Sequence, residues 1–153
     1  FVSLCFQGRS CLFGNIADGV FTPNDAGRMV EPWYSDLPKA FPHVECDEFV
    51  CMPNHVHFIL LLASATATAC KDNSSQSNES LSDAVRWLKT MTTNAYIRGA
   101  QQHGWKRFSG RLWQRGFFDR VVRSDAELVK YREYIRDNPS GWSNDQLNPG
   151  NQE

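Results

Sequence analysis

Short apolar runs bounded by turn residues mark the strands that the sequence predicts. Three runs have a length and composition typical of β-strands, and they cover residues 1–7, 44–52 and 55–62. Pro53 and Asn54 separate the last two runs, so we expect these two strands to pair as neighbours. Residues 11–25 are predicted to form a β-hairpin, because Asp18-Gly19 is a strong signal for its turn.

A different pattern, in which apolar residues recur at helical spacing behind polar caps, predicts the helices. The first helix opens near residues 24–25, where Asn and Asp are both good N-caps, and Pro32 is expected to kink or shorten it. The second covers 81–100, with Ser80 or Ser82 as its cap. We expect this second helix to bury a single face, which consists of Val85, Leu88, Thr92 and Ala95.

The last predicted helix covers residues 125–138. Ser124 is its N-cap, and Glu127 completes a capping box. Pro139 disfavours helical geometry at the residue before it and therefore ends the helix.

The segments between these elements complete the predicted order. Residues 63–80 are small and polar and are expected to form a flexible loop rather than a domain boundary, and 101–111 form a basic loop that contains glycine. Residues 112–124 are predicted to be a strand pair, or one long strand broken at Gly116. The whole order fits a single domain, 1–153, with the α+β class and a ferredoxin-like sandwich, in which helices cover one face of an antiparallel sheet.

Composition agrees with a folded protein, but charge is unevenly distributed. The chain has 153 residues, 41% hydrophobic and 22% charged, and a net charge of −1. Residues 86–136 nevertheless hold 12 of the 16 Lys and Arg and four of the 17 acidic residues, so this segment carries +8. Such a segment indicates either a surface that meets an anion, most often nucleic acid, or a solvated helix face.

Other features restrict the class of protein. The five cysteines lack a CxxC spacing, so neither a disulfide framework nor a zinc knuckle is indicated. The longest apolar run, 56–63, is too short to span a bilayer, and no signal peptide is visible. We therefore expect a cytoplasmic protein with reduced thiols and no membrane partner. Because Phe1 already lies in a predicted strand, we also expect native residues to precede it.

Two histidines at the start of the strand 55–62 form the first candidate site. Residues i and i+2 of a strand point to the same face, so His55 and His57 project side by side. A pair of imidazoles in this arrangement suits a metal ion. The alternative is a strand that enters the core with hydrogen-bonded histidines.

A second polar cluster lies on the last predicted helix. Tyr134 and Asn138 are four residues apart and share a helix face, and Tyr131 is one turn earlier. A tyrosine beside a divalent metal and a phosphodiester is a plausible nucleophile. The alternatives are a half-buried packing role for the tyrosine and a simple C-cap role for Asn138.

The sequence around these clusters resembles a known family. The stretch MPNHVHFILL at 52–61, followed by LWQRGFFDRVVRSDAELVKYREYIRDNPSGW at 112–142, is similar to the REP-associated tyrosine transposases. These are single-strand transposases with an HUH motif (His, hydrophobic, His) and one catalytic tyrosine. The early stretches CLFGNIADG and VECDEFVCMPNHVH also resemble this family, so the likeness covers nearly all of the chain.

The resemblance implies a fold and a site. It implies a ferredoxin-like fold with the HUH motif on a central strand, His55 and His57 as metal ligands, Tyr134 as nucleophile and Asn138 as a further ligand. The metal would be Mg²⁺ or Mn²⁺, and imidazole ligands suit Mn²⁺ at least as well. The family usually carries a further N-terminal segment before its first strand, often basic, which the sequence from Phe1 onward does not include; DNA affinity and substrate recognition are the properties on which this departure bears.

The implied activity is that of a metal-dependent endonuclease and strand transferase. Its substrate would be single-stranded DNA bearing a hairpin, and its intermediate a 5′-phosphotyrosine. Within the +8 segment, the expected phosphate contacts are Arg98, Lys106, Arg107, Arg111 and Arg115. Trp105 is the best candidate for base stacking, against a core role.

Two rival functions stay open at this stage, as does the oligomeric state. One rival is a non-catalytic or domesticated DNA-binding relative, and the other is a hydrolytic metal phosphoesterase. Both a monomer and a homodimer are compatible with the sequence.

Overall fold

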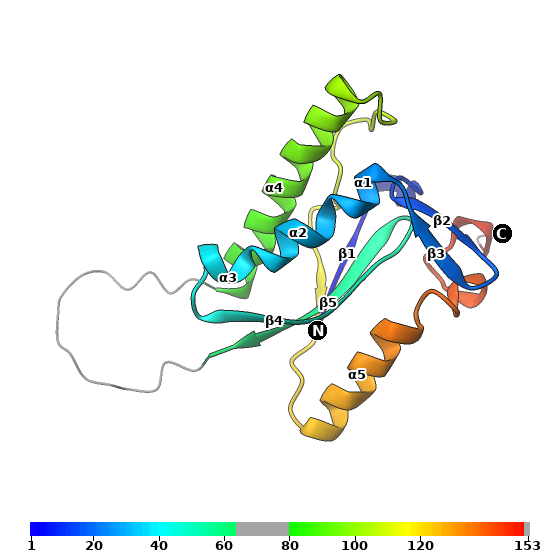
Figure 1. Ribbon diagram of the computed structural model, residues 1–153. Coiled ribbons are helices and arrows are strands. Elements are labelled where there is room, and N and C mark those ends of the chain that lie inside the picture. Colours follow the sequence, from blue (N-terminus) through cyan, green and yellow to red (C-terminus); the bar gives the residue numbers. More distant parts are fainter. Residues whose placement is uncertain (64–79, 152–153) are drawn as a thin grey trace, which may run out of the picture.

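A four-stranded antiparallel sheet forms the centre of the α+β fold in the computed structural model, which describes residues 1–63 and 80–151 (Figure 1). Its strand order is β4-β5-β1-β6. The bounds are β1 Val2–Cys5, β4 Val44–Cys51, β5 His55–Leu62 and β6 Phe118–Asp119. The predicted pairing of β4 with β5 is confirmed, and a bulge interrupts it between Cys46 and Phe49. The predicted loop at 63–80 falls almost wholly outside the described residues.

The predicted hairpin is also confirmed. Strand β2 (Gly14–Ala17) pairs with β3 (Val20–Pro23) through a two-residue turn. Asp18 and Gly19 both have positive φ, 51° and 73°, as a type I′ turn requires. Together β2 and β3 form a separate two-stranded sheet.

The helix predicted after the hairpin is divided into three short helices: α1 (Asp25–Arg28), α2 (Val30–Ser35) and α3 (Leu37–Ala40). Asn24 is the N-cap, since its Oδ1 accepts a hydrogen bond from the Gly27 N–H at 2.9 Å. Pro32 lies in the first turn of α2, where its missing N–H removes no helical hydrogen bond. The predicted helix is thus interrupted at Met29, three residues before the proline, in agreement with the expectation that Pro32 shortens it.

The long helix α4 (Leu81–Gln102) begins at Ser80, which forms a capping box with Asp83. Val85, Leu88 and Thr92 are buried as predicted. The buried face then continues through Tyr96 and Gly99 instead of Ala95. This face packs on the side of the sheet that carries Val2, Leu4, Phe6, Val56 and Phe58, where the main hydrophobic core lies.

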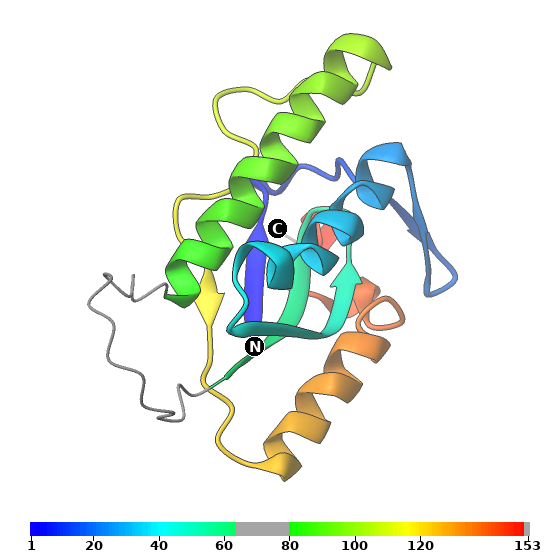
Figure 2. The same cartoon turned by 60° about the vertical axis from the view of Figure 1, so that its left-hand side comes forward.

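The last helix, α5 (Asp125–Asp137), corrects the expectation that the helices cover one face of the sheet. It contacts β4 and β5 and lies on the face opposite α2 and α4 (Figures 1 and 2). The physical reason is that the first five residues of β5 are all buried, so other elements must pack on both faces of this strand. Ser124 caps α5, with its Oγ accepting from the Glu127 N–H at 3.2 Å. The predicted capping box is not formed, because the Glu127 carboxylate accepts from the Arg123 N–H at 2.9 Å instead of the Ser124 N–H.

The expectation of a long strand or strand pair at 112–124 is wrong. Only Phe118–Asp119 pairs with β1, and Trp113 makes an isolated bridge to Phe6. Between them, the Lys89 ammonium donates to the carbonyls of Gln114 and Gly116 at 2.9 and 2.7 Å. A lysine side chain thus satisfies backbone groups that a strand neighbour would otherwise satisfy.

Two short 3₁₀ helices follow α5 and end the described chain, Trp142–Asn144 and Pro149–Asn151; a third, Gln7–Arg9, follows β1. Among the described helices, none combines the length and apolar character needed to cross a bilayer.

Candidate active site

The two histidines lie on the face of β5 that α5 covers. His55 and His57 are the first and third residues of β5, and they pair in register with Cys5 and Ser3 of β1. Their ring centroids are 4.6 Å apart, and both side chains are buried. The predicted placement of both imidazoles on one face of an inner strand is therefore confirmed.

One ring nitrogen of each histidine is held by a neighbouring side chain. His57 Nδ1 forms a short hydrogen bond with the Ser3 hydroxyl, and His55 Nδ1 lies 2.8 Å from Asn54 Oδ1. Each Nε2 is buried and has no hydrogen-bond partner among the described residues. Fixing one nitrogen in this way orients the other, as is common for metal-ligating histidines.

The surroundings keep both imidazoles neutral. Burial lowers the pKa of His55 from 6.5 to about 4, against a smaller opposing effect from Asn138. Burial also lowers the pKa of His57 to about 3, and the neighbouring His55 adds to this shift. A neutral imidazole with a free lone pair is the form that binds metal ions.

Helix α5 brings the predicted tyrosine and asparagine to this pair. The Tyr134 ring centroid lies 5.4 Å from that of His57, and the residue is 48% exposed. Asn138 is buried, and its Oδ1 has no hydrogen-bond partner within the described chain. Burial raises the pKa of Tyr134, and a contact with Asn138 opposes this, so the amide lies beside the phenol.

Tyr131, the competing tyrosine, has a different environment. It stacks on Phe1 with centroids 4.7 Å apart, and Phe1 in turn stacks on His57 at 5.3 Å. Tyr131 therefore reaches the histidine pair through another aromatic ring, whereas Tyr134 contacts His57 directly.

A cavity of about 780 Å³ opens beside these residues. Its lining includes His57, Tyr134, Asn138 and Asp145. The Asp145 carboxylate, on the segment after α5, lies 3.8 Å from His55 Nε2. Sequence reasoning missed Asp145, because nothing in its local sequence distinguishes it from a surface residue in a turn-rich segment.

The donor set fits a divalent cation of the Mg²⁺ or Mn²⁺ type. Three buried atoms that lack hydrogen-bond partners among the described residues, His55 Nε2, His57 Nε2 and Asn138 Oδ1, come from residues that lie together. Two neutral imidazoles and an amide oxygen are ordinary ligands for Mn²⁺. Among the described residues, no group of three or more His, Cys, Asp or Glu side chains is arranged to hold an ion, so the site depends on the amide.

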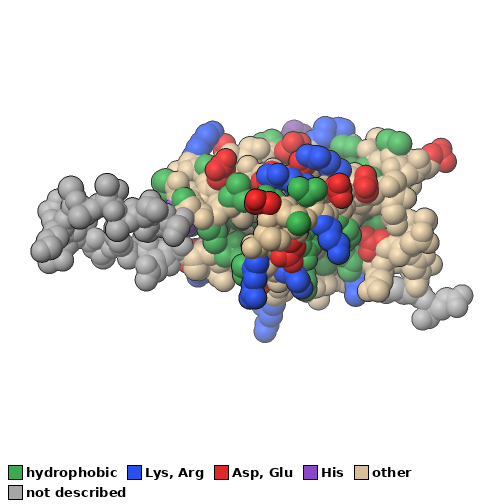
Figure 3. All heavy atoms as spheres, turned by 90° about the horizontal axis from the view of Figure 1, so that it is seen from below, with side chains coloured by type: hydrophobic (Ala, Val, Ile, Leu, Met, Phe, Trp, Pro, Cys, Tyr) green, Lys and Arg blue, Asp and Glu red, His purple; other side chains and the backbone are tan. Residues whose placement is uncertain are grey.

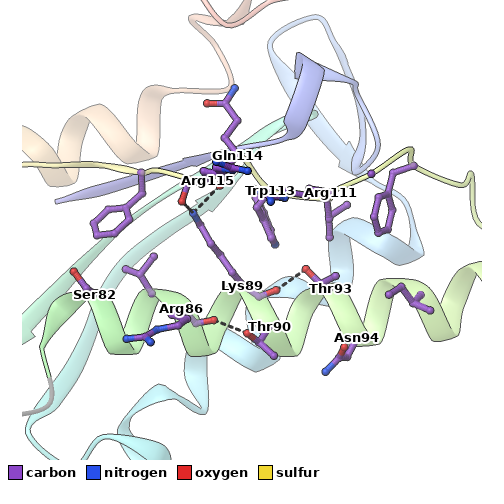
Figure 4. A pocket seen from close by; sticks show the side chains of 16 residues that line it. Ser82, Arg86, Lys89, Thr90, Thr93, Asn94, Arg111, Trp113, Gln114 and Arg115 are labelled. Atoms are coloured by element: carbon purple, nitrogen blue, oxygen red, sulfur yellow. Dashed lines mark hydrogen bonds between the residues drawn. The ribbon is translucent and has the colours of Figure 1, made fainter.

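A groove lies on the other side of the sheet, between α4 and residues 108–117 (Figure 4). Arg111 and Arg115 line it, together with Arg86 and the aromatic rings of Phe108 and Phe117. Arg86 is paired with Asp83.

The other three predicted phosphate contacts do not line this groove. Arg98 is on α4, and Lys106 and Arg107 follow that helix. Arg107 lines a small pocket beside Ile97, and Lys106 lines another beside Cys11. All five predicted cations are exposed, and within residues 1–63 and 80–151 none of them forms an ion pair.

Trp105 packs against α4. A Cβ added at Gly99 would meet the Trp105 ring, and Tyr96 makes an edge contact with it at 5.4 Å. Its indole is half-buried, so one surface of the ring is occupied by the helix.

The chain was compared with known proteins. No protein-family model matches it. A protein of Haemophilus influenzae, described only as an uncharacterized protein, is 29% identical over 159 residues, which cover 96% of this chain and 83% of the relative. The similarity extends over nearly the whole chain and carries no activity with it.

Proposed function

We propose that this protein is a metal-dependent single-stranded DNA endonuclease and strand transferase that uses Tyr134 as its nucleophile. The observation that carries the proposal is a group of three buried atoms, on His55, His57 and Asn138, that have no hydrogen-bond partner among the described residues and lie beside a half-exposed phenol. A structural histidine pair would instead have both nitrogens of each ring satisfied.

The architecture supports the same proposal. Apart from the β2–β3 hairpin and the final helix α5, and with α1–α3 taken together, the elements follow the order β-α-β-β-α-β, with β1 and β5 in the interior of the sheet. This is the order of the split βαβ, or ferredoxin-like, arrangement, which the resemblance to the REP-associated tyrosine transposases implies. The proposal therefore includes a ferredoxin-like domain with the HUH motif on β5.

The chemistry assigned to the protein side chains is a transesterification. Tyr134 Oη attacks a backbone phosphorus in line, a new O–P bond forms, and the bond to the 3′ oxygen breaks. The phenol loses its proton and the departing 3′ oxygen gains one. The product is a 5′-phosphotyrosine, which conserves the energy of the phosphodiester for later rejoining.

The metal would be held by His55, His57 and Asn138, and when bound it would neutralise charge on the non-bridging phosphate oxygens. Because burial raises the pKa of Tyr134, the phenol is a weak nucleophile in the protein alone. The cavity beside it is lined by neutral and apolar groups apart from Arg9, Asp137 and Asp145, and its volume is about 780 Å³.

A covalent-adduct assay tests the proposal. The protein is incubated with Mn²⁺ and single-stranded, hairpin-bearing oligonucleotides labelled on the 3′ side of the cut, and adducts are resolved on a denaturing gel. We expect Tyr134→Phe to abolish the adduct while keeping the fold, because it removes one half-exposed oxygen. Tyr131→Phe is the matched control and should retain measurable activity.

The outcomes separate the rival functions. An adduct that forms in Tyr134→Phe but not in Tyr131→Phe would identify Tyr131, one helical turn earlier, as the nucleophile. Cleavage without any adduct in the wild-type protein indicates a hydrolytic phosphoesterase, and binding without cleavage indicates a DNA-binding relative.

A further inference from the structure

Asn54 is a buried residue that contacts a histidine of the site but takes no part in the chemistry described above. It is the last residue before β5, and it is 1% exposed. Its side-chain amide makes three hydrogen bonds to three separate parts of the chain. Nδ2 donates to the carbonyl oxygens of Arg9 and Leu147 at 3.1 and 2.7 Å, and Oδ1 lies 2.8 Å from His55 Nδ1.

The two carbonyls fix which way the amide faces. A backbone carbonyl oxygen only accepts hydrogen bonds, so the Asn54 group that faces Arg9 and Leu147 has to be the NH₂. The reverse orientation would bring Oδ1 against two oxygens and leave all three without a proton. In a buried position, that loss of hydrogen bonds is costly.

The fixed amide in turn fixes the protonation pattern of His55. Because Oδ1 is an acceptor, His55 Nδ1 carries the hydrogen, and in a neutral imidazole the other nitrogen, Nε2, then holds the lone pair. We propose that Asn54 is a positioning residue, which uses the Arg9 and Leu147 carbonyls to hold His55 in the tautomer and orientation that bind a metal through Nε2. This inference rests on the proposed function only for the identity of the ligand, a divalent cation.

His57 provides an internal comparison. Its Nδ1 meets the Ser3 hydroxyl, which can either donate or accept a hydrogen bond. Ser3 therefore orients the ring without choosing its tautomer. Asn54 alone, of these two neighbours, dictates which nitrogen is protonated.

The tautomer is measurable in the metal-free wild-type protein. Long-range ¹H–¹⁵N correlation spectra of ¹⁵N-labelled protein distinguish a protonated ring nitrogen from one with a lone pair, and a His55→Gln spectrum assigns the signal. We expect His55 to carry its hydrogen on Nδ1. A His55 that carries it on Nε2 overturns the inference, whatever the variants do.

Two substitutions separate positioning from packing. Asn54→Leu keeps the size of the side chain but removes the acceptor, so we expect mixed His55 tautomers and Mn²⁺ binding weaker by about ten- to a hundredfold, by calorimetry. Asn54→Asp keeps an acceptor for Nδ1, so we expect His55 to carry its hydrogen on Nδ1 in this variant, although the second carboxylate oxygen then faces the Arg9 and Leu147 carbonyls and should lower the melting temperature. A purely structural role predicts His55 tautomers as mixed in Asn54→Asp as in Asn54→Leu, and that result contradicts the inference.

Asn24 supplies a matched control. Its amide also makes two hydrogen bonds, to the Leu12 carbonyl and from the Gly27 N–H, and it lines a different pocket. Asn24→Leu should lower the melting temperature and leave Mn²⁺ affinity unchanged. If Asn24→Leu also weakens Mn²⁺ binding, the effect of Asn54→Leu is due to general destabilisation, and the inference is overturned.

The experiment distinguishes this inference from the proposed function. A wild-type protein with the expected tautomer and no affinity for Mn²⁺ contradicts the proposed function and supports the assignment of the tautomer to Asn54. The opposite tautomer with normal Mn²⁺ binding contradicts the inference and supports the metal site.

Discussion

At the scale of single residues, the site is built from groups whose preferred state depends on burial. His55 and His57 lose the solvation of a charged ring, and the carboxylate of Asp145, 3.8 Å from His55 Nε2, does not offset this loss. Both rings therefore stay neutral well below their ordinary pKa of 6.5.

This neutrality predicts the pH dependence of stability. Between pH 6.5 and the folded-state pKa values, about 4 and about 3, the unfolded chain binds more protons than the folded one. The free energy of unfolding should therefore fall as pH decreases below 6.5, by up to about 1.4 kcal/mol per pH unit for each histidine. Urea unfolding of metal-free protein at a series of pH values measures this.

Substitutions assign the effect to the two rings. His55→Gln and His57→Gln should each flatten the pH dependence in this range. His103, an exposed residue at the C-cap of α4, is the control, and His103→Gln should leave the slope unchanged. An unchanged slope in both site variants would show that the buried rings do not titrate as described.

The sequence alone identified the residues with distinctive chemistry but not those that support them. His55, His57, Tyr134 and Asn138 were predicted from spacing and resemblance, and the structure brings all four together. Asn54 was interpreted only as part of a turn, because its role depends on two carbonyls that are 45 residues before it and 93 residues after it. No local pattern carries that information.

At the scale of elements, the position of α5 controls the distance between tyrosine and histidines. Arg132 pairs with Asp47 of β4 at 2.9 Å, and Arg136 pairs with Glu48 of the same strand. The β-bulge in β4 lies at these acidic residues. Consecutive residues of a regular strand face opposite sides, and a bulge changes this alternation, so both carboxylates can meet one helix.

A double-mutant cycle tests the contribution of this contact. Arg132→Gln and Asp47→Asn, alone and together, should give a coupling free energy of about 0.5–1 kcal/mol in urea unfolding, since the pair is mostly shielded from solvent. The Arg28–Asp25 pair, whose side chains are 59% and 72% exposed, should couple by only about 0.3 kcal/mol. Equal coupling in the two cycles would contradict a special role for the α5–β4 pair.

Residues 112–124 show why one element was predicted wrongly. Their apolar residues favoured a strand, but Leu112 and Trp113 are buried in the core. The Lys89 ammonium then donates hydrogen bonds to the backbone carbonyls of Gln114 and Gly116. Competition from a side chain 25 residues away cannot be read from local composition. The hairpin, α4 and α5 were predicted correctly because their turn and caps use adjacent residues.

At the scale of the whole molecule, paired and unpaired cations occupy different places. On the face that carries α5, cationic and anionic side chains are interspersed (Figure 3), in agreement with the ion pairs of Arg132 and Arg136. Arg111 and Arg115 instead line the groove beside α4 (Figure 4) and, in the described part of the chain, have no acidic partner. The net charge of the +8 segment thus overstates the number of cations that are free to contact an anionic ligand.

This difference predicts how DNA affinity responds to salt. Each phosphate contact to a single strand contributes about −0.7 to the slope of log affinity against log salt. The double variant Arg111→Gln, Arg115→Gln should make the slope shallower by about 1.4, and Arg132→Gln should leave it unchanged. Fluorescence anisotropy over a range of NaCl concentrations measures both, and an unchanged slope in the double variant would place the DNA elsewhere.

The arrangement of helices on both faces of the sheet was the main feature of the whole fold that the sequence did not predict. The signal was present in HVHFILLL, where apolar residues follow one another instead of alternating with polar ones. A strand of this kind is buried on both sides. Its second face must therefore be shielded by another element, and α5 packs there, opposite α4.

The docking of α5 on β5 also sets the point during synthesis at which the candidate site can first assemble. The histidines are synthesised early, but their tyrosine and amide partners follow about 80 residues later, and the Leu147 carbonyl that holds Asn54 comes later still. A nascent chain on the ribosome thus contains both imidazoles well before the phenol and the amide that lie beside them in the folded protein. Under the proposed function, a chain truncated before Tyr134 keeps the histidine pair but lacks the nucleophile, so it should form no covalent adduct with DNA.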